Sequence, residues 1–401
     1  MTETPELDLS RRGRVVFTVA VVMSSTCVAQ AFGRFTWGVA LPGARDELLD
    51  GSNTLAGFFG TVNVTAYLLG TLLMSWMSSK LTPVQLVRFG LTISTVSLGT
   101  AAFSNSAAVL GIALFFMGLG GAIIWIPAPA IGARVFPPER AGIAVGLAGS
   151  GIGVGIVFAG QLASWLGRTR DAVDVWQLVY KIEFSVAVIV LAATLLVFKS
   201  EGQRPAAAGG FGGFGALRTV RAWIPTTVAY TAYGFAYILV IAFLVARLKD
   251  DSGFSASEAA LMFSLVGIAA AFGGVALGAL SDRIGRRITL MGAFIMFAAC
   301  GLLILTGQQP IVAIASIGAG LGFSGAPSLI TGHIVAHTDS STYGPAFAAA
   351  TLSFGIAQMI SPQIGGLIAD ATGSFTTVFA LSATLAMVGA LAASRLPRLG
   401  T

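Results

Sequence analysis

The chain has 401 residues, of which 55% are hydrophobic and 10% are charged, and its formal net charge is +6. Soluble domains carry about 25% charged residues, so this composition excludes a water-soluble globular fold for most of the chain. The mean hydropathy of +0.86 supports the same conclusion.

About twelve apolar runs follow one another, each long enough to cross a bilayer as a helix of about 20 residues. They lack the period-two alternation of a membrane β-barrel, and only helices or closed barrels satisfy the backbone in lipid. The sequence therefore predicts an all-α membrane protein with twelve transmembrane helices. The runs lie at residues 15–41, 54–77, 83–104, 107–133, 141–165, 176–198, 222–248, 257–280, 287–305, 310–336, 343–369 and 375–394.

The first run has two interpretations. Arg11, Arg12 and Arg14 precede apolar residues that end in an Ala-Gln-Ala tripeptide at 29–31, which is also the pattern of a cleaved secretory signal. Cleavage there would leave an odd number of spans and remove one member of an internal repeat. A first transmembrane helix is therefore the favoured interpretation.

Arg34 lies twenty positions after Arg14, about 30 Å further along a helix, and so past the membrane midplane. A charge at such a depth costs about 2.5–3.5 kcal/mol, which disfavours a lipid-facing position. Gln30 and Arg34 are four residues apart on one helix face, with Trp37 beside them. We expect Arg34 to anchor an anion, because its guanidinium pairs bidentately with carboxylates. The alternatives are snorkelling and a structural bond to helix carbonyls.

Other spans supply polar and aromatic side chains for a lining around this arginine. Aromatic rings with a few polar tips suit a small organic acid, although helix packing is the alternative role for each aromatic residue. The expected substrate-binding residues besides Arg34, Gln30 and Trp37 are Asn63, Tyr67, Trp125, Tyr233, Tyr237, Phe354 and Gln358.

Acidic residues appear only near the ends of the predicted spans. Glu183 is placed close to the start of the sixth span, and Asp282 and Asp370 are placed at loops. The central cavity is therefore expected to carry net positive charge and to favour anions. Coupling is then expected to use a proton on the substrate or exchange for a counter-anion.

Two tripeptides repeat at a nearly constant offset. Ala31-Phe32-Gly33 recurs as Ala232-Tyr233-Gly234, and Gly118-Leu119-Gly120 recurs as Gly320-Leu321-Gly322. Transporters built from such repeats hold their substrate between the halves, near the midplane. The repeat predicts two six-helix bundles and a cytoplasmic linker, at residues 1–198, 222–401 and 199–221.

The linker contains a formal G-x-G-x-x-G pattern at residues 210–215. No strand precedes it and no βαβ unit surrounds it, so a nucleotide site is not expected. Cys27 and Cys300 lie in different halves, and His333 and His337 have no third ligand with metal-site spacing. The sequence therefore indicates no cofactor, no metal site and no disulfide.

Between the eighth and ninth runs the chain reads Gly278-Ala-Leu-Ser-Asp282-Arg283-Ile-Gly285-Arg286-Arg287. This charged loop resembles the loop between helices eight and nine of the major facilitator superfamily. The resemblance implies a secondary transporter with two pseudo-symmetric six-helix halves. Asp282 is expected to face the positive N-terminal end of the eleventh helix. With Arg283, Gly285, Arg286 and Arg287 it would then bias a rocking equilibrium, unless the arginines only fix topology.

The first two spans and the seventh resemble a narrower group, the YbfB/YjiJ-type transporters. The resemblance lies in Phe32-Gly-Arg34-Phe35-Thr-Trp-Gly-Val-Ala-Leu41-Pro42, in Gly60-Thr-Val-Asn63 with Tyr67, and in Tyr233-Gly-Phe-Ala-Tyr237. It implies Arg34, Asn63 and Tyr67 as motif positions.

Lys and Arg concentrate in the loops on one side when the N-terminus is placed in the cytoplasm. By the positive-inside rule, both termini are expected to be cytoplasmic in a multi-pass inner-membrane protein. The positive charge is thus assigned to topology and lipid headgroups, and no nucleic-acid partner is expected.

These observations favour a secondary active transporter, a monomer that works by rocker-switch alternating access and moves a small organic carboxylate anion. Its expected partners are that substrate, protons or a counter-anion, and the lipid bilayer. One alternative is an exporter of broad specificity for hydrophobic or drug-like compounds. A third is a receptor or scaffold that transports nothing. An enzyme is not expected, because no nucleophile–base pair or phosphate-binding loop is present.

Overall fold

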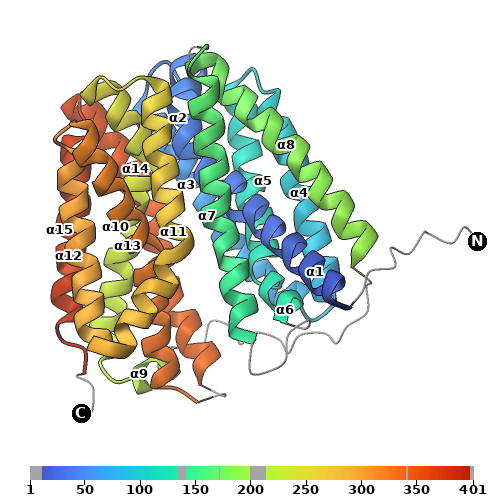
Figure 1. Ribbon diagram of the computed structural model, residues 1–401, viewed down its shortest axis with the longest axis vertical. Helices are drawn as coiled ribbons and strands as arrows, with labels where there is room; N and C mark the ends of the chain where they lie inside the picture. Colours follow the sequence, from blue (N-terminus) through green and yellow to red (C-terminus); the bar gives the residue numbers. More distant parts are fainter. Residues whose placement is uncertain (1–10, 134–140, 171, 199–213, 340–341, 398–401) are drawn as a thin grey trace, which may run out of the picture.

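The computed structural model describes residues 11–133, 141–170, 172–198, 214–339 and 342–397, and these residues form helices joined by short loops (Figure 1). No strand occurs in the described part, which confirms the all-α fold class. The N-terminal helices are α1 Arg11–Thr26, the π-helix η1 Cys27–Phe35, α2 Thr36–Leu48, α3 Asn53–Met77, α4 Pro83–Ala102, α5 Ala107–Trp125, α6 Ala128–Ala133, α7 Ala141–Leu166 and α8 Ala172–Val197. The C-terminal ones are α9 Phe214–Thr219, α10 Trp223–Ala246, the π-helix η3 Arg247–Asp251, α11 Ala256–Ile284, α12 Arg286–Ile304, α13 Gln309–Ala336, α14 Tyr343–Thr372 and α15 Thr376–Ala393.

Four of the long helices, α3, α4, α5 and α11, begin at side chains that cap their free backbone N–H groups. Ser52, Thr82 and Ser106 each accept a hydrogen bond from the third residue of the following helix. Ser255 does the same at α11 and forms a capping box with Glu258. These caps satisfy donors that a helix end leaves unpaired, and they separate neighbouring spans.

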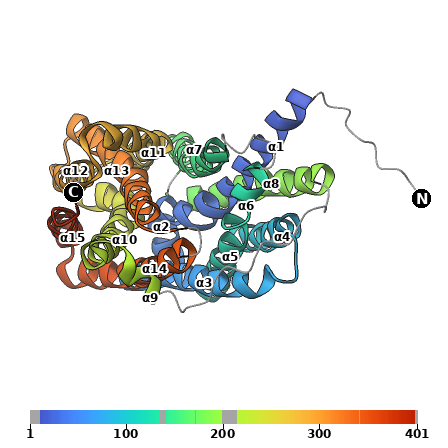
Figure 2. The same cartoon turned by 90° about the horizontal axis from the view of Figure 1, so that it is seen from below.

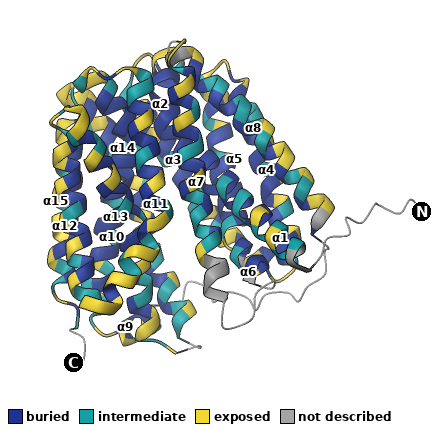
Figure 3. Cartoon of the chain, in the orientation of Figure 1, coloured by how far each residue is buried: buried dark blue, intermediate teal, exposed yellow. Residues whose placement is uncertain are grey.

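Eleven of the described helical segments have the length and apolar composition to cross a membrane. The remaining long helix, α4 Pro83–Ala102, packs between α5 and α8 and corresponds to the third predicted span. Large apolar side chains face outward, and Ile189, Leu196, Val275 and Ile314 are each at least 68% exposed. In Figure 3 the exposed residues, in yellow, are spread over many of the helices. Such a surface belongs in lipid rather than in water.

The helices form two groups that pack side by side, α1 to α8 and α9 to α15 (Figure 2). The main packing between the groups pairs α3 with α14, α7 with α11 and α2 with α10. Most of the predicted linker, residues 199–213, lies outside the described residues. The candidate site is formed where the two groups meet.

The first span differs from the sequence expectation. It runs without a break from Arg11 to Leu48, and its middle, η1 Cys27–Phe35, is a π-helix of nine residues. The Thr36 backbone N–H bonds to the Ala31 carbonyl five residues earlier, which is the π pattern. π-turns inside long helices are often found at functional sites, and this one carries Gln30 and Arg34.

Candidate functional site

Arg34 links the two groups of helices. Its Nη1 donates to Gln30 Oε1 on the same helix at 2.9 Å, and its Nη2 donates to Gln358 Oε1 of α14 at 3.0 Å. Both glutamines are only 3% exposed. Both hydrogen bonds end on neutral amides, and none of the described residues places a carboxylate against this guanidinium.

Aromatic side chains surround the same cation. The Arg34 guanidinium carbon lies 4.1 Å from the centroid of the Tyr67 ring and 5.4 Å from that of Phe35. The hydroxyls of Tyr67 and Tyr237 both interact with its charge. The Arg34 Nε is buried and has no hydrogen-bond partner. The side chain is therefore held by ring faces and amides, and part of its hydrogen-bonding capacity is unused.

The C-terminal half supplies a stack of aromatic rings. Tyr233 and Tyr237 stack with centroids 4.8 Å apart, and Phe354 stacks on Tyr230 at 4.3 Å and on Tyr233 at 5.8 Å. The Tyr233 hydroxyl donates to the Phe323 carbonyl. Tyr237, Phe354 and Gln358, which the sequence proposes as substrate-binding residues, thus lie on the C-terminal side of the site, while the Tyr233 hydroxyl bonds the backbone.

Of three other predicted residues, two have mainly structural contacts and one lies away from the cavity. Asn63 donates to the Gly33 and Leu114 carbonyls, each at 2.8 Å, and Trp37 Nε1 donates to the Ala56 carbonyl at 3.2 Å. Trp125 forms the end of α5 and does not line the cavity beside Arg34. The expectation that Trp125 binds substrate therefore has no support from its position.

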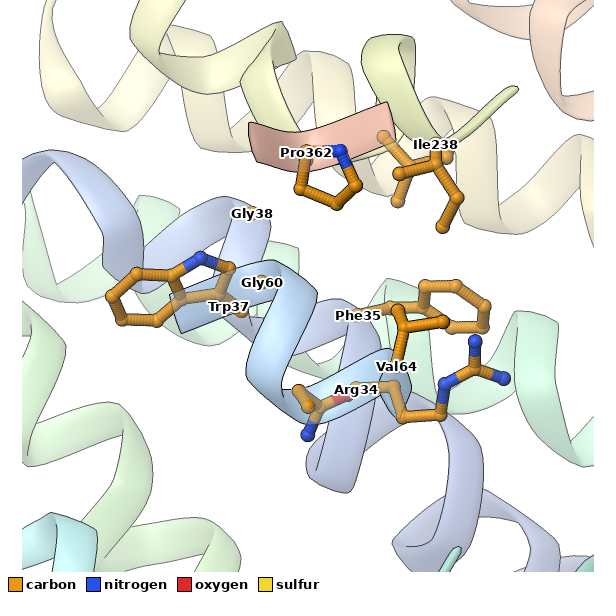
Figure 4. Close-up of a pocket in the computed structure, with 11 residues that line it drawn as sticks. Arg34, Phe35, Trp37, Gly38, Gly60, Val64, Ile238 and Pro362 are labelled. Carbon is orange, nitrogen blue, oxygen red and sulfur yellow. The ribbon is translucent and has the colours of Figure 1, made fainter. Parts of the chain in front are cut away.

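A small cavity lies beside Arg34, between the halves. Its lining includes Trp37, Asn63 and Val64 from one half and Ile238 and Pro362 from the other (Figure 4). Its volume of about 30 Å³ holds only two or three waters, since each water needs about 10–15 Å³ of such space. An organic molecule therefore enters only when the halves or the side chains move.

Glu183 contradicts the expectation that acids lie only near the ends of spans. Its helix, α8, begins at Ala172, so Glu183 lies well inside the span, and it is fully buried. The Thr36 hydroxyl donates to Glu183 Oε1 at 2.7 Å. The sequence estimate failed because it started this helix at residue 176 and gave no information about burial.

The predicted gating loop forms the junction of α11 and α12, where Gly285 adopts a left-handed φ of 92°. Asp282 and Arg283 are exposed, and Arg286 and Arg287 are half-buried. Asp282 has no hydrogen bond or ion pair with any described residue, so the expected contact with the start of α14 is absent from this state.

An ion-pair network joins the halves at the end of the molecule opposite the termini, which we call the far end: the loops at residues 49–52, 252–255 and 373–375. Arg45 of α2 pairs with Asp46 and with Asp250 of η3, and Lys249 pairs with Asp46 at 3.2 Å. Asp370 accepts from the backbone N–H groups of Asn53 and Thr54. The far end is therefore closed in this structure.

Sequence reasoning missed Phe35, Phe323 and Thr36 as neighbours of the site. The Phe323 ring packs edge-on against the Phe35 ring, with centroids 5.4 Å apart. It also lies tilted against the Tyr237 ring, with centroids 5.3 Å apart. A signal was present, because Phe323 directly follows the repeated Gly320-Leu321-Gly322. Thr36 carries no comparable signal, since its partner is 147 positions away.

A bundle of membrane-spanning helices in two groups, with a half-buried cation at their interface, is typical of a membrane transport protein. Residues 26–394 match the family described as "Uncharacterised MFS-type transporter YbfB". The match covers most of the chain, so the protein belongs to this family of MFS-type transporters. It is a multi-pass membrane protein of a transporter family and not an enzyme.

Two relatives have a similar sequence. The probable sulfoacetate transporter SauU of Cupriavidus necator is 27% identical over 181 residues, which are 43% of this chain and 42% of that protein. The match thus spans less than half the length of that relative. The uncharacterized MFS-type transporter YfhI of Bacillus subtilis is 26% identical over 344 residues, 83% of each chain.

Two solved structures share the fold. A D-xylose–proton symporter superposes with a TM-score of 0.73 at 16% identity, over 96% of this chain and 98% of that one. A bacterial homolog of the human lysosomal transporter Spinster, solved in an inward-facing and unoccupied conformation, superposes with a TM-score of 0.71 at 17% identity. The match covers 96% of this chain and 94% of that one. At these identities the likeness establishes the fold alone.

Proposed function

We propose that the protein moves a small organic anion across the inner membrane by alternating access, with Arg34 as the anion-binding residue. Both termini then lie in the cytoplasm, and the far end faces outward. The halves at 1–198 and 222–401 rock about the site, and the linker at 199–221 connects them.

The observation that carries this proposal is a half-buried guanidinium between the halves whose hydrogen-bonding partners among the described residues are all uncharged: the amides of Gln30 and Gln358 and the hydroxyl of Tyr237. A carboxylate or sulfonate accepts stronger, charge-assisted hydrogen bonds from guanidinium than a neutral amide does. An anion that enters between the halves is therefore expected to replace Gln358 or Gln30 at Arg34. Replacing Gln358 breaks a bond between the halves, which connects binding to rocking.

The relative from Cupriavidus necator supports the same substrate class. Its name assigns it sulfoacetate, a small molecule with a carboxylate and a sulfonate group. Tyr67, Phe35 and Tyr237 around Arg34 complete a site that holds one anionic head against aromatic faces.

The test is a thermal-shift screen of the detergent-purified protein with sulfoacetate, simple carboxylates, sugars and lipophilic cations. A ligand that binds only the folded protein raises its unfolding temperature. We expect stabilisation by a few anions that is lost in Arg34→Gln and reduced in Arg34→Lys, because lysine lacks the bidentate geometry. Arg168→Gln, at an exposed loop arginine, is the matched control.

Two results would contradict the proposal. Anion stabilisation that survives in Arg34→Gln would leave Arg34 a structural residue. The second result is stabilisation only by lipophilic cations or neutral amphiphiles, of equal size in the wild type and in Arg34→Gln. It would support the broad-specificity exporter, with the aromatic stack of Tyr230, Tyr233 and Phe354 as the binding surface.

A further inference from the structure

Glu183 is a buried carboxylate whose hydrogen bonding is incomplete. It is fully buried in α8, and Oε1 accepts the hydroxyl of Thr36 at 2.7 Å. Its second oxygen, Oε2, is also buried and has no partner. A charged carboxylate that leaves water without an adjacent cation or a full set of donors is destabilised, and this favours proton binding.

The elements packed against α8 provide no cation for it. The helices around α8 are α4, α2, α1 and α7 with part of η1. Titratable neighbours that interact electrostatically with Glu183 are Cys27 of η1 and Tyr180 one turn earlier on α8, and neither is a cation. On α4, Arg88 donates instead to carbonyls at the end of α8, including Thr194 and Leu195.

The other charged side chains nearby are used elsewhere. Lys181 lies over the ring of Phe103, and Glu47 of α2 accepts the indole N–H of Trp176. Within the described residues, Glu183 therefore forms no ion pair. The Tyr180 hydroxyl is likewise buried without a partner, so two unsatisfied polar groups lie on adjacent turns of α8.

We propose that Glu183 is a proton-binding site, and that its protonation is coupled to the rocking of the two halves. A proton from one side of the membrane forms an O–H bond at Glu183 Oε2, and the same bond breaks when the proton leaves to the other side. No electron is transferred and no other reactant is needed. The consequence for transport, a proton carried together with the anion, rests on the function proposed above.

The geometry connects this site to Arg34. Thr36, the partner of Glu183, follows directly after η1, which carries Arg34, in one continuous helix. Without ligands, the charges of Arg34 and Glu183 cancel. When an anion with one negative charge is bound at Arg34 and a proton is bound at Glu183, the net charge of the two sites is again zero. Binding of the anion alone or of the proton alone leaves a net charge inside the membrane, which is unfavourable. The anion and the proton are therefore expected to cross together.

Infrared spectroscopy of the purified protein without substrate tests proton binding directly. As the pH is varied, we expect the C=O stretching band of a protonated carboxyl in an apolar environment. This band is absent from Glu183→Gln and retained in the matched control Glu47→Gln, because Glu47 is an exposed glutamate of the same half. A band that persists in Glu183→Gln, or no such band in the wild type, would overturn the proposal.

A second measurement tests the coupling and also needs no substrate. Spin labels at Phe58 of α3 and Leu367 of α14, both 48% exposed, report the distance between the halves. We expect the ratio of closed to open far end to change with pH, by at most about tenfold per pH unit for one proton. The change disappears in Glu183→Gln and remains in Glu47→Gln.

The same measurement separates this inference from the anion proposal. Arg34→Gln removes the anion site but keeps Glu183, so its pH-dependent distance change is expected to persist. Thr36→Val tests positioning, because it removes the hydroxyl donor and is expected to move the midpoint of the pH response. A pH response of equal size in Glu183→Gln and the wild type would show that the coupling residue lies elsewhere.

Discussion

At the scale of single residues, Asn63 shows how the fold holds the site in place. One amide group bonds the Gly33 carbonyl of η1 and the Leu114 carbonyl of α5. It therefore joins three helices next to Arg34. The resemblance to a transporter group marked Asn63 as a motif position, and its contacts indicate a positioning role rather than contact with substrate.

Replacing Asn63 is expected to destabilise the protein. Asn63→Leu removes the donor that bonds both carbonyls, at roughly 0.5–1.5 kcal/mol for each lost hydrogen bond. The unfolding temperature in detergent should fall well below that of Asn105→Leu, a change at an exposed loop asparagine. Equal unfolding temperatures for the two variants would show that water replaces these bonds.

Gln358 offers a sharper test of the anion site. Gln358→Glu places a carboxylate at the atom that accepts from Arg34 Nη2, and the two side chains then form an ion pair. We expect anion-dependent stabilisation to be lost although Arg34 is intact. Gln308→Glu, at an exposed position before α13, is expected to bind anions normally. Normal anion binding by Gln358→Glu would place the ligand elsewhere.

The sequence offered Arg34, Gln30 and Gln358 as candidates because a charge or an amide inside an apolar run is rare and needs a partner, and the structure brings these three side chains together. It did not identify Glu183 as buried, because a helix boundary estimated from hydropathy moved the start of α8 by four residues. It also could not distinguish side chains that face the cavity from those that bond a neighbouring backbone. Asn63 and Tyr233, which donate to backbone carbonyls, show this limit.

At the scale of elements, close helix contact at the far end depends on glycine. A Cβ atom at Gly57 of α3 would overlap the backbone of Pro362 in α14. In α7, by contrast, nothing lies within 4 Å of a Cβ at Gly149. The two glycines therefore serve different purposes although both lie in membrane helices.

Gly57→Ala is accordingly expected to separate the halves at the far end. The distance between labels at Phe58 and Leu367 should increase, because backbone atoms of Pro362 cannot move aside as a flexible side chain does. Gly149→Ala should leave the distance unchanged and stabilise α7 by up to about 1 kcal/mol. A distance unaffected by Gly57→Ala would mean that α3 and α14 adjust without separating.

The order and approximate bounds of the helices could be predicted from the lengths and positions of the apolar runs. The π-helix could not, because its nine residues are too few for their side-chain pattern to separate a π period from an α period. Its presence depends on packing against α5 and α7, which only the folded chain provides.

At the scale of the whole molecule, the structure has one end closed by ion pairs, and the charged loop at Asp282 lies at the other. Arg45, Asp46, Lys249 and Asp250 connect the halves only while the far end is closed. Asp282, without a partner among the described residues, is available to pair when the opposite end closes. The two groups of charges are thus expected to favour opposite states.

Charge variants should therefore shift the conformational equilibrium in opposite directions. Asp250→Asn is expected to increase the fraction with an open far end, and Asp282→Asn to decrease it, as measured by the Phe58–Leu367 label distance. The exchange Arg45→Asp with Asp250→Arg should restore closure in part, since it recreates the pair in reverse. A shift in the same direction for Asp250→Asn and Asp282→Asn would contradict this assignment.

The π-helix in the first span has a mechanical consequence. Each π-turn holds one residue more than an α-turn, and one residue corresponds to about 100° of rotation around an α-helix. If one of these turns relaxed to the α form, the helical segments on either side would rotate relative to each other by that angle. Arg34 would then turn away from Gln358, or Thr36 away from Glu183. A one-residue change of register inside a single helix would thus act as a rotary switch, without any flexible joint.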